Sequence, residues 1–311
     1  MIEVEAGRAM VFHRLALAVL PIDAASGLPI GSGVRVGRET VRSVDRAMRL
    51  PRRPGRPAPY QDVPLRGGYG AAYVLHHSPL DGVQTAGPVR PPPSPAVIRI
   101  EDPAGRWIPR RFTVPLWTLA DAESSDRVVD ESGQATDPSG PFVVPTARSV
   151  SPWLLPGPGY RAPDTTTGLR LRVTRGGQPV RWPRVEAFTT TGRLGWAHGD
   201  RHGDVLLLAS ERAAFPPPGT ANLPIALRVS TRDPAVDLPD EVRDRLKAGD
   251  ELADLAIEPF PRPPNVSPPA SPSSLDQGLD VPGGYLTAPD VAAAIRPGRI
   301  TRILPDLDLP S

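Results

Sequence analysis

Apolar and polar residues alternate along residues 168–209, which is the pattern of strands that bury one face. Residues 169–174 read LRLRVT, and a later apolar run at residues 205–208 reads VLLL. Short turns separate four strand-like segments, and their glycines accept the positive φ angles that tight turns require. These turns lie at residues 175–178, 191–192 and 200–204. Four short strands joined by tight turns, without a helical period, predict an antiparallel β-sandwich.

A weaker version of this pattern occupies the N-terminal part of the chain. Apolar residues alternate through residues 11–20, and residues 97–114 predict a hairpin around the turn Asp-Pro-Ala-Gly at residues 102–105. The sequence SGLPI at residues 26–30 also resembles GGQPV at residues 176–180, which is a weak internal repeat. The predicted fold class is therefore all-β, with two small antiparallel β-sandwich domains.

Proline marks the segments between and after these domains. The chain has 43 prolines and 29 glycines in 311 residues, a share that favours stiff, extended connectors. Within the second domain, residues 240–246 predict a short helix. We expect five segments: an N-terminal sandwich at 1–120, an interdomain segment rich in proline, glycine and serine at 121–166, a second sandwich at 167–258, a proline-rich linker at 259–276, and a tail at 277–311 that docks on this chain or on a partner.

Composition argues against several kinds of partner and location. The net charge is +2 and no basic run is interleaved with aromatic residues, so nucleic acid is not an expected partner. No stretch approaches the roughly 20 apolar residues that span a bilayer, so membrane insertion is not expected. Residues 15–20 follow acidic residues and lack a small-residue cleavage pattern, so they predict a strand rather than a signal peptide. The absence of cysteine favours a cytoplasmic location.

Residues 198–204 contain the histidines and carboxylates of a candidate metal site. His198 and His202 alternate there with Asp200 and Asp204, which offers two imidazoles and two carboxylates. This spacing converges only on a helix, and the intervening glycines favour a turn instead. The chain also has none of the motifs of a hydrolase elbow, a Rossmann fold or a P-loop. We therefore expect no catalytic residue, no metal site and no cofactor, and predict that the protein is not an enzyme.

The aromatic residues are the strongest candidates for binding. Tryptophans in small sandwiches serve as core residues or interface anchors more often than as platforms for stacking sugars. We predict a protein–protein interface, with a glycan as the alternative ligand. The candidate interface residues are Trp107, Trp117, Trp153, Trp182, Trp196 and Tyr285.

Two sequence patterns in the second domain carry a resemblance to a known family. Residues 177–180 match G-x-P-V, and residues 200–207 match D-x-x-G-[DE]-[FV]-x-L. In these patterns the chain resembles the carboxypeptidase regulatory-like (prealbumin-like) β-sandwich family. This resemblance implies an immunoglobulin- or prealbumin-like sandwich and says little about activity, because such modules serve as spacers, adhesins and assembly parts.

The arrangement of the whole chain resembles proteins of contractile injection systems, the phage-tail-like particles of bacteria. The matching stretches are residues 15–30, 97–115 and 168–208. The resemblance implies a non-catalytic baseplate- or spike-associated component that binds protein partners and assembles in the cytoplasm. Two other hypotheses remain open: a carbohydrate- or cell-surface-binding module, and an enzyme whose site carries no recognisable motif.

Overall fold

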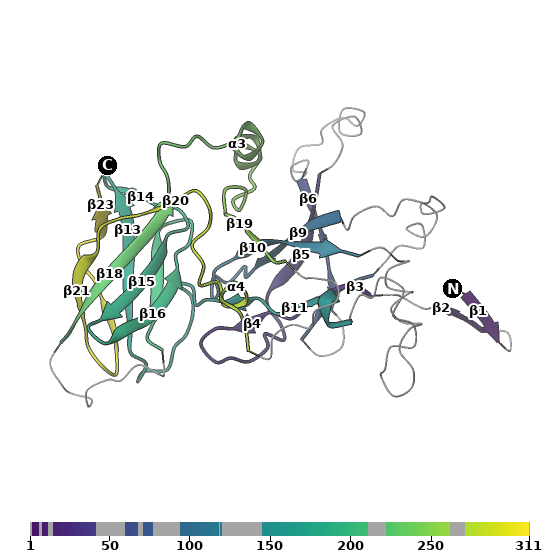
Figure 1. Ribbon diagram of the computed structural model, residues 1–311, viewed down its shortest axis with the longest axis horizontal. Helices are drawn as coiled ribbons and strands as arrows, with labels where there is room; N and C mark the ends of the chain where they lie inside the picture. Colours follow the sequence, from purple (N-terminus) through teal and green to yellow (C-terminus); the bar gives the residue numbers. More distant parts are fainter. Residues whose placement is uncertain are drawn as a thin grey trace, which may run out of the picture.

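The computed structural model describes residues 2–5, 8–11, 15–41, 60–67, 71–76, 94–117, 119, 145–210, 222–261 and 271–310 (Figure 1). Strands dominate this part of the chain, as the all-β prediction requires. A short antiparallel hairpin, β1 (Ile2–Glu5) and β2 (Arg8–Val11), precedes two β-sandwiches.

The first sandwich consists of two principal sheets around one apolar core. One sheet has the order β19-β10-β9-β5-β6 and the other the order β11-β3-β8-β7, with β12 and β4 paired beside them. The first sheet contains β5 (Arg35–Val41), β6 (Tyr60–Pro64), β9 (Ser94–Glu101), β10 (Arg110–Leu116) and β19 (Ile257–Pro259). The remaining elements are β3 (Leu15–Val19), β4 (Ile22–Asp23), β7 (Arg66–Gly67), β8 (Tyr73–His76), the 3₁₀-helix η2 (Pro145–Arg148), β11 (Ser149–Val150) and β12 (Trp153–Leu154).

The hairpin predicted at residues 97–114 is confirmed by the antiparallel pairing of β9 with β10. Its turn is held by Asp102, whose carboxylate accepts the backbone N–H groups of Ala104 and Arg106 at 3.1 and 2.7 Å. Ile98 and Phe112 face each other across the pair, and both are fully buried in the first core.

The second sandwich forms around the stretch that alternates most clearly in the sequence. One sheet has the order β14-β13-β17, with β22 and β23 parallel to β13, and the other has β16-β15-β18, with β20 and β21 both on β18. The elements from residues 168–232 are β13 (Gly168–Arg175), β14 (Gln178–Pro179), β15 (Arg184–Thr189), β16 (Gly192–His198), β17 (Asp204–Leu208) and β18 (Leu223–Arg232). The C-terminal strands are β20 (Tyr285–Thr287), β21 (Val291–Ile295), β22 (Ile300–Arg302) and β23 (Leu307–Leu309).

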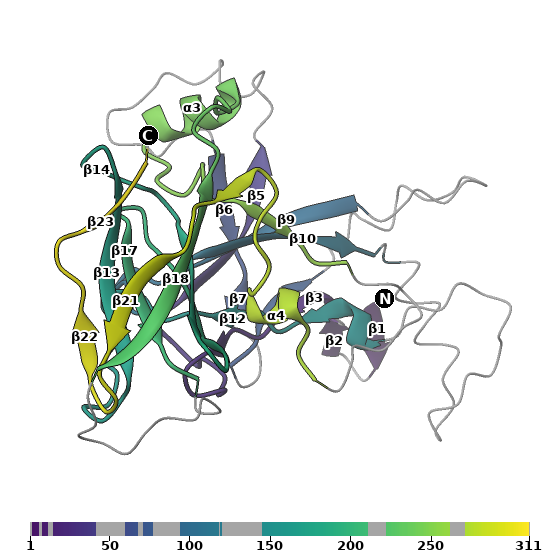
Figure 2. The same ribbon diagram turned by 60° about the vertical axis from the view of Figure 1, so that its left-hand side comes forward.

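The chain passes from the second sandwich to the first and back again. After β18, residues 233–261, which we call the strap, contain the helix α3 (Asp240–Lys247), a tight loop at 250–255, and β19. β19 adds to the first sandwich by parallel pairing with β10. The helix α4 (Ser274–Gln277) follows, and the chain then returns to the second sandwich as β20–β23 (Figure 2).

Because the chain crosses between the sandwiches, the segments predicted from the sequence do not coincide with the two sandwiches. Residues 257–260 lie in the first sandwich, where the Phe260 ring packs 4.8 Å from that of Phe112. The described residues of the predicted interdomain segment, 145–166, include β11 and β12, which also pair within the first sandwich. The tail predicted at 277–311 docks on this chain, where Ile295, Leu307 and Leu309 join the second core. The predicted boundary at residue 258 therefore coincides with the end of neither sandwich.

The helix predicted at residues 240–246 is confirmed as α3, which begins with Asp240 and Glu241 and ends with Lys247. This order of charges suits the helix dipole. Among the described residues, no helix has the length and apolar character that a membrane crossing requires.

Candidate functional site: the junction between the sandwiches

One carboxylate joins a strand of each sandwich at their junction. Glu258, on β19, accepts hydrogen bonds from Arg110 of β10 and from Arg184 of β15, the latter at 3.1 Å. Both arginines are within 1% of complete burial, and Glu258 is 6% exposed. Ionic groups withdrawn from water in this way are costly unless each has a partner. Glu258 is therefore the partner on which the burial of both arginines depends.

Arg110 also fixes the short helix α4 to the first sandwich. Its guanidinium donates to the backbone carbonyls of Leu275 and Asp276, both at 2.8 Å, and to that of Trp153 at 2.9 Å. A cation suits this position because carbonyls at the C-terminal end of a helix can also accept hydrogen bonds from basic side chains. The chain that leaves α4 for the second sandwich is therefore anchored on the first.

His198 contacts the end of α4 from the second sandwich. It is fully buried on β16, and its Nε2 donates to the carbonyl of Gly278 at 2.7 Å. Gly278 has φ 67°, and a Cβ there would lie 3.1 Å from the His198 ring, so both conformation and space favour glycine. Burial, and then the charges of Arg184 and Arg110, hold the pKa of His198 well below its ordinary value of 6.5. The imidazole is therefore neutral in the folded protein.

Because His198 is buried with a lowered pKa, we expect the stability of the protein to depend on pH. An unfolded chain protonates the histidine below about pH 6.5 while the folded chain does not, so the free energy of unfolding is expected to fall as the pH drops from 6.5. The slope approaches about 1.4 kcal/mol per pH unit for one proton. His198→Gln, whose amide can still donate to Gly278, is expected to remove the slope between pH 6.5 and 5.

Urea denaturation at half-unit pH steps measures this slope, and His202→Gln is the matched control because His202 lies exposed on a turn. An unchanged slope in His198→Gln would contradict the role assigned to the buried imidazole.

Two partly buried carboxylates titrate below this pH window. The pKa values of Glu39 and Asp250 are lowered from their ordinary values near 4, so the stability that these ionised groups contribute is lost only at lower pH.

A second cluster fixes the strap to the outer face of the first sheet. Glu39 of β5 accepts hydrogen bonds from Arg99, Arg111 and Arg245, and Asp250 accepts them from Arg99 and Arg245. Burial alone would raise the pKa of Glu39, but the hydrogen bond and charge of Arg111, with the charge of Arg99, keep it below its ordinary value. The cluster thus joins β5, β9 and β10 to α3 and the strap loop.

The strap loop binds both sandwiches at once. On one side, Arg111 donates to the carbonyls of Leu252, Ala253 and Leu255 at 2.7–3.2 Å. On the other side, Asp254 accepts two hydrogen bonds from Arg181, at 2.6 and 2.8 Å, and one from the indole of Trp182 at 2.9 Å.

Trp182 occupies a strained backbone position at this contact. Among the described residues it is the one non-glycine residue with a positive φ, at 57°. Its N–H donates to the carbonyl of Asp200 at 3.0 Å, and its own carbonyl accepts the hydroxyl of Tyr285 at 3.1 Å. Together with the bond to Asp254, these contacts hold the backbone in its unfavourable conformation.

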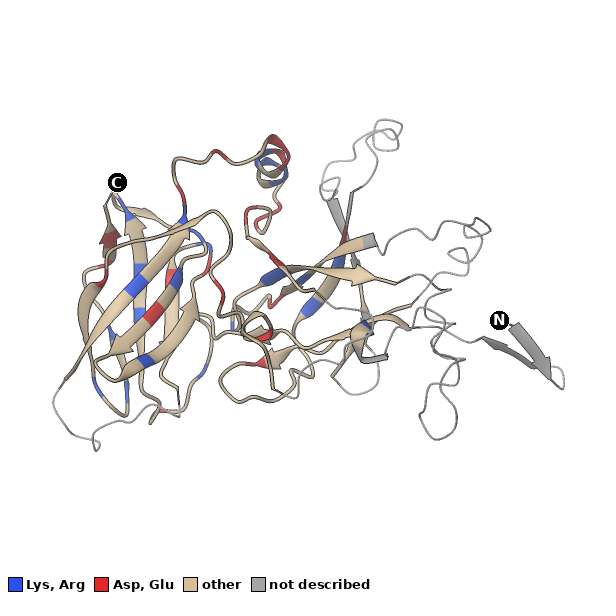
Figure 3. Cartoon of the chain, in the orientation of Figure 1, with Lys and Arg blue, Asp and Glu red and all other residues tan. Residues whose placement is uncertain are grey.

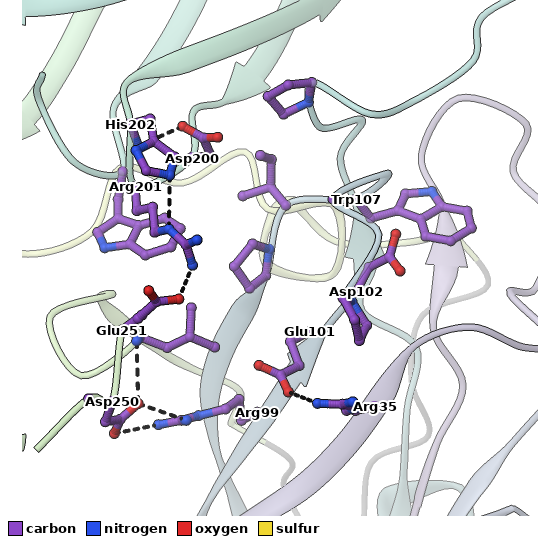
Figure 4. Close-up of a pocket in the computed structure, with 18 of the residues that line it drawn as sticks. Arg35, Arg99, Glu101, Asp102, Trp107, Asp200, Arg201, His202, Asp250 and Glu251 are labelled. Carbon is purple, nitrogen blue, oxygen red and sulfur yellow. Dashed lines mark hydrogen bonds and ion pairs between the residues drawn. The ribbon is translucent and has the colours of Figure 1, made fainter. Parts of the chain in front are cut away.

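A cleft of about 780 Å³ opens beside the junction. Its walls come from the β9–β10 turn, the β16–β17 turn and the strap loop, which contribute among others Trp107, His202 and Asp250 (Figure 4). Most of its charged side chains already have partners: Arg99 bonds to Asp250, and Arg201 to Glu251. Burial raises the pKa of Asp200, although backbone N–H groups of His202 and Asp204 oppose the shift. The cleft thus presents paired charges of both signs.

The structure separates the two histidines of the candidate metal site at residues 198–204. His198 is buried against α4, whereas His202 lies on an exposed turn and accepts a hydrogen bond from Arg201 at 3.0 Å. Asp200 closes the turn by accepting backbone N–H groups, as the glycine pattern predicted. Within the described ranges, no group of three or more histidine and acidic residues is placed to hold a metal ion.

The predicted aromatic residues lie largely at contacts within this chain. Trp117, Trp182 and Trp196 are at most 8% exposed. Trp107 is partly buried beneath the guanidinium of Arg106, at 4.5 Å from its ring centre, and Trp153 is partly buried where its carbonyl accepts Arg110. Tyr285 contacts Trp182 as described above. The sequence predictions missed the arginines that surround these residues, although Arg110 has the same strand parity as the core residues Phe112 and Val114.

Comparison with known proteins gives little further information. No protein-family model matches the chain, and no curated protein matches it. Among solved structures, the shaft pilin SpaA from Lactobacillus rhamnosus GG is 8% identical and has a TM-score of 0.19, with 96% of this chain and 98% of the pilin covered. A variant of the same pilin gives a TM-score of 0.20, with 94% and 97% covered. Likeness at this level carries no argument about function.

Proposed function

We propose that this chain is a non-catalytic structural protein, whose two sandwiches act as one rigid unit in a larger protein assembly. The observation that carries the proposal is the buried contact of Glu258 with Arg110 and Arg184, which ties β10 and β15 through the strap. A linker would leave the sandwiches free to reorient, whereas this contact and the repeated crossing of the chain fix their arrangement. Such rigidity suits a subunit that holds neighbouring subunits of an assembly at a fixed distance and orientation.

The distribution of charged residues argues against a nucleic-acid partner. Arginine residues interleave with aspartate and glutamate along the strands of both sandwiches (Figure 3). Nucleic-acid-binding proteins instead gather basic residues on one face or stripe. We therefore retain protein partners, without nucleic acid or membrane insertion, as part of the proposal.

The specific assembly that we propose is the baseplate or spike region of a contractile injection system. Support comes from the sequence resemblance described above, in which a strand-rich N-terminal module precedes a carboxypeptidase regulatory-like sandwich. Assembly in the cytoplasm belongs to the same proposal. A carbohydrate- or cell-surface-binding role is less well supported, because Trp117, Trp182 and Trp196 are buried and do not form an exposed stacking platform.

Sedimentation of a native lysate tests this proposal. We expect the protein to migrate with a particle of several megadaltons that contains tube and sheath subunits, and to leave that fraction when the sheath gene is deleted. Migration at or near its own mass of 33.2 kDa, whether or not such particles are present, would contradict the assembly role and favour ligand binding instead.

A further inference from the structure

We infer that the edge strand β21 is a self-complementary interface through which two copies of this chain pair. β21 lies on the side of β18 away from β15 (Figure 1), and among the described residues β18 is its sole strand partner. The strand reads VAAAI and carries no charge. Open strand edges attract other strands, and proteins normally protect them with lysine, proline or a bulge. Residues 291–295 contain none of these.

The register shows which backbone groups face the open edge. Ala288 donates to the carbonyl of Val229 at 2.8 Å, so odd-numbered residues of β18 direct their backbone groups toward β20 and β21. Pro224 lies opposite Ala294 in the register and is even-numbered, so its backbone groups are not directed toward β21, which fits a residue without an N–H. Residues 291, 293 and 295 therefore bond to β18, whereas Ala292 and Ala294 direct their N–H and C=O groups outward. Both alanines are exposed and too small to obstruct a neighbouring strand.

The side chains on either side of Ala293 are complementary in type about that residue. The sequence from 289 to 297 is PDVAAAIRP, in which proline matches proline, aspartate matches arginine, and valine matches isoleucine about the central alanine. A second copy of β21, placed antiparallel about a two-fold axis at Ala293, pairs Ala292 with Ala294 of that copy. Each such pair exchanges two backbone hydrogen bonds, which gives about four across the interface. A self-complementary patch of this kind is the requirement for an isologous dimer.

Charge complementarity selects the second copy as the occupant. In this register Asp290 of each chain lies opposite Arg296 of the other, on the same exposed face as the two alanines. Both side chains are exposed, and their present contacts are surface ones: Asp290 with Arg228 at 3.0 Å, and Arg296 with Asn222 at 2.7 Å. Opposite charges across a strand pair stabilise it, and like charges destabilise it. A foreign strand would match this row of charges only by chance.

Sedimentation velocity of the purified full-length chain tests the interface. We expect a concentration-dependent equilibrium between the monomer of 33.2 kDa and a dimer of twice that mass. Asp290→Arg and Arg296→Asp each place like charges at both ends of the pair, and each is expected to weaken dimerisation by about tenfold or more. The double variant D290R/R296D restores opposite charges and is expected to dimerise like the parent.

Mixing the two single variants gives a result specific to the two-fold arrangement. Within a mixed dimer, the new Arg at 290 of one chain faces the new Asp at 296 of the other, and the unchanged ends also carry opposite charges. We therefore expect one-to-one heterodimers from two variants that dimerise poorly alone. Arg193→Asp, an equivalent charge change on β16 at the opposite edge of the same sheet, is the matched control and should leave dimerisation unchanged.

A parent chain that stays monomeric at all concentrations would overturn the inference, as would single variants that dimerise like the parent. The inference deepens the proposed assembly role by naming one interface, yet its test is independent. Dimerisation of purified protein reports on β21, and migration with a large particle reports on the assembly, so each can fail alone.

Discussion

Replacing Glu258 by glutamine is expected to lower the free energy of unfolding by about 3–5 kcal/mol, because it leaves two buried guanidinium groups without a negative partner. The amide keeps the shape of the carboxylate, so the loss reports on charge rather than on packing. Arg110 retains its carbonyl acceptors, whereas Arg184 loses its ion-pair partner. Urea denaturation followed by circular dichroism measures the change.

Glu251→Gln is the matched control for this variant. Glu251 also pairs with an arginine, Arg201, but its side chain is 59% exposed, and exposed pairs contribute at most about 1 kcal/mol. If Glu258→Gln were no more destabilising than Glu251→Gln, the contact at the junction would not hold the sandwiches together.

Replacing Leu171 by aspartate is expected to unfold the second sandwich. Leu171 is 5% exposed in the second core, between the strands that pair with β13 on either side. A carboxylate there loses the apolar burial of leucine and adds an unpaired buried charge, so the cost exceeds the roughly 2–5 kcal/mol of a simple truncation. This is comparable to the whole stability of a typical domain.

Leu286→Asp makes the same substitution at a leucine that is 54% exposed on β20. It is expected to change the free energy of unfolding by no more than about 0.5 kcal/mol. A thermal melt of both variants distinguishes the two positions. Equal melting temperatures for Leu171→Asp and the parent would show that the strand register assigned to β13 is wrong.

The sequence predicted best those elements that leave a local pattern. The turn at residues 102–105 and the helix α3 depend on contacts close along the chain. β13 shows a clear alternation because one of its faces is buried, although its partners β17, β22 and β23 are distant in sequence. The pairing of β19 with β10 depends instead on residues far apart in sequence. The sequence therefore assigned residues 257 and 258 to the end of the second sandwich, and residues 259 and 260, which begin a proline-rich stretch, to a linker.

The junction was hidden from the sequence for a related reason. An arginine in a strand normally indicates a solvent-exposed face. Arg111 and Arg184 alternate with core residues, as exposed arginines do, and Arg110 alone shares the parity of the core residues on its strand. Their burial results from the strap and from α4, whose positions no local pattern encodes. The tryptophans were predicted as anchors of an interface, and in this structure most of their described contacts lie between parts of the same chain.

Hydrogen exchange in the Leu171→Asp variant tests most directly the claim that the two sandwiches form one interlocked unit. Without the second sandwich, β19 can pair with β10 only by closing an unfolded loop of about 100 residues, which costs about 4–5 kcal/mol. We therefore predict that amide protection in β10 and β9 falls together with protection in β13. Full protection of β9 and β10, in a variant whose second sandwich is unfolded, would contradict the account and show two independent domains.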